Sequence, residues 1–251
     1  MIDCEMVFSP SSSLGDTIVA SPIARHFSKM CRRLHVPVSP WVIPTARELY
    51  KEDTNIAVVD YHTDTQLDNY INANNLIRLI GPPIFTVPCD STFSCVLWDE
   101  QWYTHYDVPF GQRYSGFNLP AKSSNSRDLF KKLVTKERFI LTHTQWTNHK
   151  TIPIDMHTWR KDSGLDDLDQ FQIIDLTPQL SSNLLDFVEL ISGAEEIHCV
   201  PSCVFCLVDS ITNKTNARLF YHDIRKNTMM RVNHRWNNHR WCMISYQNKI
   251  L

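Results

Sequence analysis

The chain has 251 residues, of which 43% are hydrophobic and 21% are charged, so it can bury a large core in one domain or two smaller ones. Its formal net charge of -2 creates no overall field that would attract nucleic acid. The sequence contains no apolar run of the about 20 residues that a membrane-spanning helix needs. Acidic residues stand near its start, where a signal peptide would carry basic ones. We therefore expect a cytoplasmic protein without a membrane span.

The first half of the chain alternates between strand and helix patterns. The expected strands cover residues 5–9, 35–44 and 55–61, and the expected helices cover about 16–32, 45–53 and 65–81. Such alternation is typical of an α/β fold with a parallel sheet.

The middle of the chain, about residues 82–120, is rich in proline and then in aromatic residues, and we expect no regular element there. Alternation resumes in the second half. The expected helices cover residues 126–134, 181–194 and 201–215, and the expected strands cover 138–143, 171–177, 195–200 and 217–223. The break in the pattern predicts two domains, residues 1–120 and 121–251. The predicted fold is therefore α/β, with two Rossmann-like halves that face each other across a cleft.

The stretch "SSSLGDTIVASPIARHF" places Gly15 and Asp16 between the first strand and the first helix. Glycine permits a tight turn, and aspartate is a good residue for capping a helix. Asp16 can equally be a carboxylate at the mouth of the cleft. Both interpretations of Asp16 remain open at this point.

The second half places polar residues after its central strands. His143 ends the strand "RFILTH" and Gln145 follows it, so both are candidates for contacting a ligand, although such a histidine is often only a solvated loop residue. A helix is expected to start at Pro201–Ser202–Cys203, with proline in its first turn, and the exposed amides of that turn can bind a diphosphate. An ordinary capped helix is the alternative interpretation.

Two arginines are further candidates. Arg113 stands in "WYTHYDVPFGQRYSGF" and can bind a phosphate or an acidic sugar, or form a salt bridge between the halves. Arg225 begins a basic and aromatic tail and is a candidate for donor phosphate. Tails of this kind can bind single-stranded nucleic acid, but the overall acidity argues against a nucleic-acid partner.

The sequence lacks several ligand signatures. It contains no GxGxxG, no GxxxxGK[ST] and no DxD in a loop after a strand. Its eight cysteines include one CxxC, Cys203 and Cys206, without a second pair at zinc spacing. We therefore expect reduced cysteines and no metal site.

Five segments together resemble a known family. They are "LGDTIVASPIARHF", "YKEDTNIAVV", "WYTHYDVPFGQRYSGF", "RFILTH" and "LISGAEEIHCVPSCVFCLVD". The chain resembles short glycosyltransferases of the GT-B type, similar to heptosyltransferases and to compact transferase-like proteins of bacteria and large DNA viruses. The resemblance spans most of residues 13–225. If the source is a virus, we expect the protein in the host cytoplasm.

This resemblance implies a function and roles for particular residues. It implies transfer of a hexosyl or pentosyl group from a nucleotide-diphosphate sugar, for which we expect a UDP-sugar, to a glycan or glycoprotein hydroxyl. The transfer would be inverting and metal-independent, with no cofactor. Asp16 would be the catalytic base beside Gly15 on the acceptor side, and Ser202 and Cys203 would hold the donor diphosphate in the nucleotide-sugar-binding half. Pro201 departs from the family pattern, which often has an acid there. The alternative is a non-catalytic nucleotide- or glycan-binding protein of the same fold.

Overall fold

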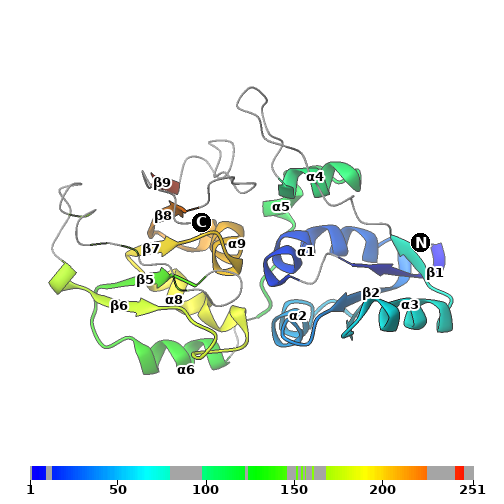
Figure 1. Ribbon diagram of the computed structural model, residues 1–251, viewed down its shortest axis with the longest axis horizontal. Helices are drawn as coiled ribbons and strands as arrows, with labels where there is room; N and C mark the ends of the chain where they lie inside the picture. The colour runs from blue at the N-terminus through cyan, green and yellow to red at the C-terminus, as the bar shows by residue number, and fades with distance from the viewer. Residues whose placement is uncertain are drawn as a thin grey trace. The chain divides into compact units, whose positions relative to one another are not determined.

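The computed structural model describes residues 2–9, 13–79, 98–121, 124–145, 151, 154, 156, 160, 168–224 and 241–245. The chain divides into two compact units, Met1–Ala121 and Lys122–Leu251 (Figure 1). Each unit contains a parallel β-sheet with helices, so the α/β class predicted from the alternating pattern is confirmed.

The first unit is built on a four-stranded sheet in the order β3-β2-β1-β4. Its strands are β1 (Ile2–Phe8), β2 (Cys31–Val38), β3 (Ile56–Asp60) and β4 (Ile77–Leu79). Its helices are α1 (Leu14–Ser28), α2 (Ile43–Leu49), α3 (Asp64–Ala73), α4 (Trp98–His105) and α5 (Gln112–Ser115). All three strand pairings are parallel.

Helices cover both faces of this sheet. The side chain of Phe8 contacts Phe27 of α1, with ring centroids 6.5 Å apart, whereas its neighbour Val7 packs with Leu67 and Ile71 of α3. Because successive strand residues point to opposite faces, α1 and α3 lie on opposite sides of β1 (Figure 1). This two-sided burial explains why β1 and β2 are rich in apolar residues without strict alternation.

Three expectations for the first unit are wrong in detail. The first helix ends at Ser28, so Cys31 already begins β2. The helix expected over residues 65–81 ends at Ala73, because Asn75 takes a left-handed conformation with φ 51 and Ile77–Leu79 pair with β1. Residues 98–121, for which no element was expected, contain α4 and α5.

The second unit is built on a five-stranded parallel sheet in the order β6-β5-β7-β8-β9. Its strands are β5 (Phe139–His143), β6 (Gln172–Asp175), β7 (Glu196–Cys199), β8 (Arg218–Asp223) and β9 (Trp241–Ser245). Its helices are α6 (Ser124–Leu133), α8 (Val188–Gly193) and α9 (Cys203–Ser210), with the 3-10 turns η2 (Leu168–Gln170), η3 (Leu184–Phe187) and η4 (Thr212–Lys214).

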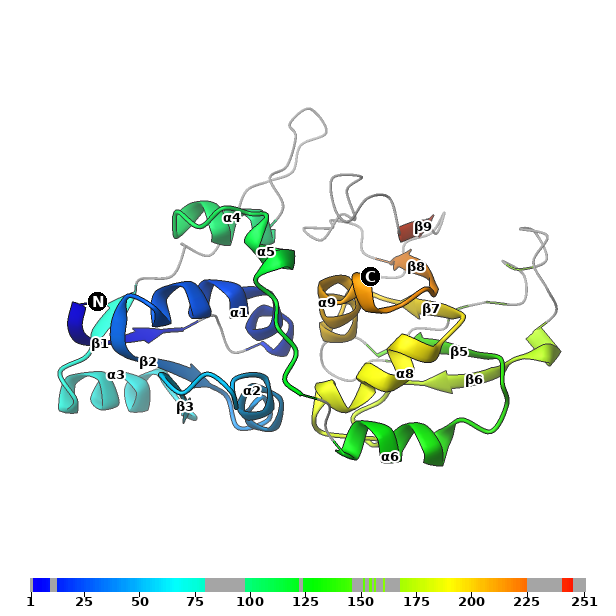
Figure 2. The same ribbon diagram turned by 180° about the vertical axis from the view of Figure 1, so that it is seen from behind.

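The helices α8 and α9 cover one face of this sheet, the face turned toward the viewer in Figure 2. Phe205 of α9 packs on Tyr221 of β8 and Trp241 of β9, with ring centroids 5.0 and 4.9 Å away. On the other face Ile140 packs with Met156, Leu168 and Phe171 in a separate apolar cluster.

Expectations for the second unit are also wrong in detail. The single helix expected over residues 181–194 is η3 followed by α8, and the helix expected over 201–215 is α9 followed by η4. The strand β9 follows the strand that we expected to be the last. In the part of the chain that the structure describes, no helix has the length and apolar character needed to cross a membrane.

Candidate functional site

The strand orders mark one edge of each sheet as a binding edge. In a parallel sheet the carboxyl ends of all strands lie at the same edge. Ligands bind at this edge at the topological switch point, where the connections from two neighbouring strands run to opposite sides of the sheet. In the first unit this switch point lies between β1 and β4, and in the second it lies between β5 and β7. The residues that follow β1, β5 and β7 are therefore the candidates for contacting a ligand.

The loop after β1 leads into α1, and the structure identifies Ser13 as the cap of this helix. The Ser13 hydroxyl accepts a hydrogen bond from the Asp16 amide at 3.1 Å, and the Ser13 carbonyl accepts one from the Thr17 hydroxyl at 3.0 Å. The expected capping role of Asp16 and turn role of Gly15 are therefore wrong, because both residues lie inside the first turn of α1. Asp16 is partly buried and lies beside the positive end of the helix dipole.

The ends of β5 and β7 are joined directly. The Val200 amide, just after β7, donates a hydrogen bond to the His143 carbonyl at the end of β5 at 3.2 Å. This bond brings the loop that begins at Thr144 beside the turn that contains Ser202. The structure thus places four predicted residues, His143, Gln145, Ser202 and Cys203, around one switch point.

His143 itself is a buried and uncharged ring. Its Nδ1 lies 2.6 Å from the Leu176 carbonyl, which fixes Nδ1 as the protonated nitrogen. Burial lowers the pKa of His143, although the Leu176 carbonyl and the Asp175 carboxylate act in the opposite direction. His143 therefore offers no positive charge to a phosphate. We interpret it as the residue that ties β5 to the segment after β6.

Gln145 lies one step beyond this strand and has a different character. Its backbone pairs with Thr151 in an isolated antiparallel bridge. Its side-chain oxygen Oε1 is buried and accepts no hydrogen bond from any residue that the structure describes. A buried oxygen of this kind suits a ligand that carries a hydrogen-bond donor.

The turn after β7 ends in a capped helix. The Ser202 hydroxyl accepts a hydrogen bond from the Phe205 amide at 3.3 Å, and the Ser202 carbonyl accepts one from the Cys206 amide at 3.2 Å. Helix geometry leaves the amides of Cys203 and Val204 without an intrahelical acceptor, so these two amides form the potential anion site. Pro201 stands before the cap rather than in the first helical turn.

Cys203 contributes to this site through its backbone. Burial raises the pKa of its thiol to about 11, although the amides of Val204 and Cys203 act in the opposite direction, so the thiol is protonated at neutral pH. The thiol therefore adds no reactive or charged group beside the two amides.

Asp175 is a further candidate for contacting a ligand, which the sequence analysis did not name. It ends β6, next to β5, and its partly buried carboxylate accepts hydrogen bonds from the hydroxyls of Thr142 at 2.9 Å and Thr144 at 3.1 Å. Rossmann-type folds place an acid that binds ribose at the end of the strand that corresponds to β6. The acid at the end of "FQIID" was the available signal.

The two predicted arginines have different outcomes. Arg113 is only 1% exposed, and its Nε lies 3.7 Å from Asp99 Oδ2 within the first unit. Its guanidinium also lies over the Tyr114 ring, 5.2 Å from the centroid. This environment gives Arg113 a role inside the first unit. Arg225 lies outside the described residues.

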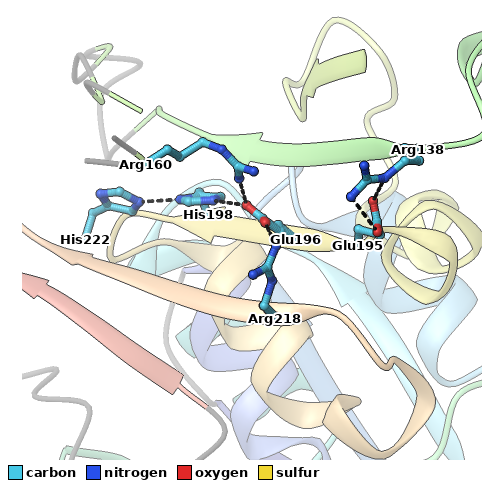
Figure 3. A network of polar contacts seen from close by, with 7 residues as sticks. All are labelled: Arg138, Arg160, Glu195, Glu196, His198, Arg218 and His222. Atoms are coloured by element: carbon cyan, nitrogen blue, oxygen red, sulfur yellow. Dashed lines mark hydrogen bonds and ion pairs between the residues drawn. The ribbon is translucent and has the colours of Figure 1, made fainter. Parts of the chain in front are cut away.

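A buried polar network lies on one face of the second sheet (Figure 3). Glu196, which is 0% exposed, forms ion pairs with Arg160 and Arg218, and its Oε2 lies 3.3 Å from His198 Nε2. His198 Nδ1 in turn lies 2.9 Å from His222 Nε2. Glu196 and His198 belong to β7 and His222 belongs to β8, so only folding brings the three side chains together.

The charges in this network follow from burial and contact. Burial alone would raise the pKa of Glu196, but the hydrogen bond from His198 and the charges of Arg160 and Arg218 lower it below its usual value. Burial lowers the pKa of His198 and lowers that of His222 to about 3. Glu196 is therefore charged and both rings are neutral at neutral pH. Among the described residues, no three His, Cys, Asp or Glu side chains converge in a way that could hold a metal ion.

The fold is similar to that of known glycosyltransferases. A glycosyl transferase family 9 protein from Veillonella parvula matches with a TM-score of 0.55 and 10% identity, over 99% of this chain and 89% of that one. The dodecameric, iron-containing heptosyltransferase TibC, in complex with ADP-D-beta-D-heptose, matches with a TM-score of 0.50 and 16% identity, over 90% of this chain and 61% of that one.

These likenesses establish the fold. The sequence matches no family model, and no curated protein has a significant match to it. The resemblance to glycosyltransferases that the sequence motifs suggested is confirmed at the level of the fold, which is the fold of glycosyl- and heptosyltransferases.

Proposed function

We propose that this chain is a glycosyltransferase that transfers a sugar from a nucleoside-diphosphate sugar to a hydroxyl group of a glycan. The observation that carries the proposal is the fold likeness to a family 9 glycosyltransferase, which extends over 99% of the chain. The placement of the polar residues agrees with it, since groups that suit each half of the reaction lie at the switch points of the two sheets.

The second unit is the proposed donor site. The amides of Cys203 and Val204 at the start of α9 would bind the diphosphate and stabilise it as the leaving group. The Asp175 carboxylate would accept hydrogen bonds from the ribose hydroxyls, and Gln145 Oε1 would accept one from the base or the sugar. A fold neighbour is described with ADP-D-beta-D-heptose, so ADP-sugars belong in the test beside the UDP-sugars that we expect.

The first unit is the proposed acceptor site, with Asp16 as the general base. Ser13 is the N-cap of α1, and Asp16 lies in the first turn of that helix, after the end of β1. In the proposed step the acceptor oxygen bonds to the anomeric carbon while the bond from that carbon to the diphosphate oxygen breaks. The acceptor proton goes to Asp16, and the single displacement inverts the anomeric centre. The step requires the two units to face each other across a cleft, which is part of the proposal.

A second candidate function is a non-catalytic nucleotide- or glycan-binding protein. The position of Asp16 favours this alternative to a degree, because a carboxylate in the first turn of a helix stabilises the helix without doing chemistry. The two functions differ in one measurable respect. Both predict nucleotide binding, but only the transferase turns the donor over.

The test is a panel of ADP-, UDP-, GDP- and CMP-sugars with the full chain. A donor that binds at a hundredfold excess over its dissociation constant should stabilise the protein by about 2.7 kcal/mol, which a thermal melt detects. Donors that stabilise the protein are then incubated with it, and released nucleotide is measured with and without a glycan mixture. Nucleotide release that depends on the glycan supports the transferase. Stabilisation without release supports the binding protein, and no stabilisation by any donor contradicts both.

A further inference from the structure

The carboxylate of Asp175 is held by two hydroxyl groups of the neighbouring strand and its loop. The Thr142 hydroxyl donates to Oδ1 at 2.9 Å, and the Thr144 hydroxyl donates to Oδ2 at 3.1 Å. Thr142 and Asp175 are register partners in the β5–β6 pair, so their side chains lie on the same face. Each carboxylate oxygen thus receives its own donor, which fixes the plane of the group.

This arrangement leaves binding capacity unused. An ionised carboxylate has about four acceptor positions, and the two threonines occupy one on each oxygen. With respect to the residues that the structure describes, two acceptor positions therefore remain, one on each oxygen, in an orientation that the two threonines set in advance. Two neighbouring hydroxyl groups on one rigid ring, as in ribose, match such a pair of acceptors.

We call Thr142 and Thr144, which hold the Asp175 carboxylate, the clamp. The position of Thr144 argues against a purely structural role for this clamp. Backbone pairing between β5 and β6 ends with the Thr142–Asp175 pair, and Thr144 lies one residue beyond β5. Its hydroxyl is therefore not needed to align the strands. Its contact with Asp175 instead extends the pair beyond the carboxyl end of β5, the edge of the sheet at which the proposed donor binds.

We propose that Thr142 and Thr144 are positioning residues that orient Asp175 to recognise both hydroxyls of the donor ribose, so that the site selects ribonucleotides over 2′-deoxyribonucleotides. This inference rests on the proposed donor site. Fixing an acceptor group before the ligand arrives removes the entropic cost of ordering it on binding. Loss of either threonine hydroxyl lets the carboxylate rotate, which weakens the two-point contact with the ribose more than the contact with the diphosphate.

The experiment compares ribose and 2′-deoxyribose forms of the same nucleotide. ADP, 2′-deoxy-ADP, UDP and 2′-deoxy-UDP are titrated into the full chain by calorimetry. The variants are Thr142→Val and Thr144→Val, which remove a hydroxyl, and Thr142→Ser, which keeps it. Thr135→Val is the matched control. The Thr135 hydroxyl donates a hydrogen bond to Gln172 Oε1 at 3.2 Å, and Gln172 lies at the opposite end of β6 from Asp175.

The expected result is a change in the ratio of the affinity for the ribose form to the affinity for the 2′-deoxyribose form of the same nucleotide. The 2′-deoxy form lacks one hydrogen bond to the Asp175 carboxylate. We therefore expect the unaltered chain to bind the ribose form about 10- to 100-fold more tightly. Each Thr→Val variant should reduce this preference several-fold, while Thr142→Ser and Thr135→Val should retain it. A structural defect would weaken both nucleotides equally and leave the ratio unchanged.

Two outcomes would overturn the inference, and they are distinguishable. In the first outcome ADP or UDP binds, and both Thr→Val variants show the same ribose preference as the unaltered chain. Thr142 and Thr144 then do not orient Asp175, although the donor site stands. If neither nucleotide binds the unaltered chain, the donor site and the clamp are both wrong. A variant that melts at a lower temperature still reports the ratio, provided that the titration is done below its melting range.

Discussion

His198 and His222 face each other on neighbouring strands, with Nδ1 of the first ring 2.9 Å from Nε2 of the second. Because His198 Nε2 donates to the charged Glu196, its Nδ1 carries the lone pair and accepts the proton of His222 Nε2–H. The chain of hydrogen bonds therefore has one direction. An added proton on His222 Nδ1 leaves these hydrogen bonds intact. A proton on His198 Nδ1 would instead place two N–H donors, His198 Nδ1–H and His222 Nε2–H, opposite each other.

This pair predicts that the second unit loses stability in acid. In the folded chain burial lowers the pKa of both rings, to about 3 for His222, whereas an unfolded histidine has a pKa of about 6.5. Between these values the unfolded chain binds more protons, so the free energy of unfolding rises with pH. The contribution of the pair is present above about pH 6.5 and is lost as the pH falls below it. Urea unfolding midpoints measured at several pH values test this.

The variant His222→Gln separates the histidine pair from other titrating groups. Gln can donate to His198 but does not titrate, so its unfolding midpoint should fall less between neutral and acidic pH. Arg160 and Arg218, which also face Glu196, are present in both chains. The control is His62→Gln, since the His62 side chain is 64% exposed in the first unit. Equal acid loss in the unaltered chain and in His222→Gln would exclude His222 as the cause and leave His198 and the carboxyl groups, Glu196 among them.

The backbone amide of Cys203 is predicted to contribute to diphosphate binding. Cys203→Pro removes this amide at the first helical position, where proline is well tolerated. Ser202, with φ -164 and ψ 174, already has the extended conformation that a residue before proline prefers. Loss of one hydrogen bond to a charged ligand should weaken ADP or UDP binding by about tenfold. Cys203→Ala removes only the thiol and should bind normally. Equal binding by both variants would remove this amide from the site.

Transfer is predicted to survive removal of divalent metal ions. In the proposal the amides at the start of α9 provide the positive potential that the leaving diphosphate needs. The sequence analysis also found no DxD in a loop after a strand, the position expected in a metal-dependent transferase. Activity should therefore persist after dialysis against EDTA. Because one fold neighbour is described as iron-containing, the metal content of the purified chain should be measured in parallel. Loss of activity that magnesium, manganese or iron restores would contradict the prediction.

The sequence allowed the strand, turn and helix units to be predicted, because apolar spacing and capping residues are local signals. Ser202 illustrates this, since its capping role was one of the two interpretations that its position before a helix suggested. Glu196 illustrates the limit. Its place in the expected strand 195–200 gives no sign of its partners, and only folding brings Arg160 and Arg218 to it from distant positions. Asp175 was missed for the same reason, because its partners Thr142 and Thr144 come from another strand.

Register also could not be predicted from local pattern. Ile77–Leu79 continue an apolar pattern that fits the preceding helix, and only the left-handed Asn75 and pairing with β1 make them a strand. The strand β9 pairs with β8 through Leu219 and Trp241, so its assignment depends on a neighbour that is distant in sequence.

The last prediction concerns Asp16 as the general base. Asp16→Asn keeps the size of the side chain and removes its ability to take a proton, so turnover should fall by about 10²- to 10⁴-fold. Stability should fall by only about 0.3–1 kcal/mol, the usual value of an acid near a helix N-terminus, because Ser13 still caps α1. Donor affinity should be unchanged, since the proposed donor site is in the second unit. Melting temperature, donor titration and turnover are measured together.

Ser13→Ala is the matched control for this experiment. It removes the cap of the same helix turn and should cost about 0.5–2 kcal/mol of stability, while the carboxylate of Asp16 remains. If Asp16 acts only through the helix, Ser13→Ala should reduce turnover at least as much as Asp16→Asn does. If Asp16 is the base, Ser13→Ala should lose stability and keep most of its turnover, and Asp16→Asn should show the reverse. Near-normal turnover in Asp16→Asn would exclude Asp16 as the base.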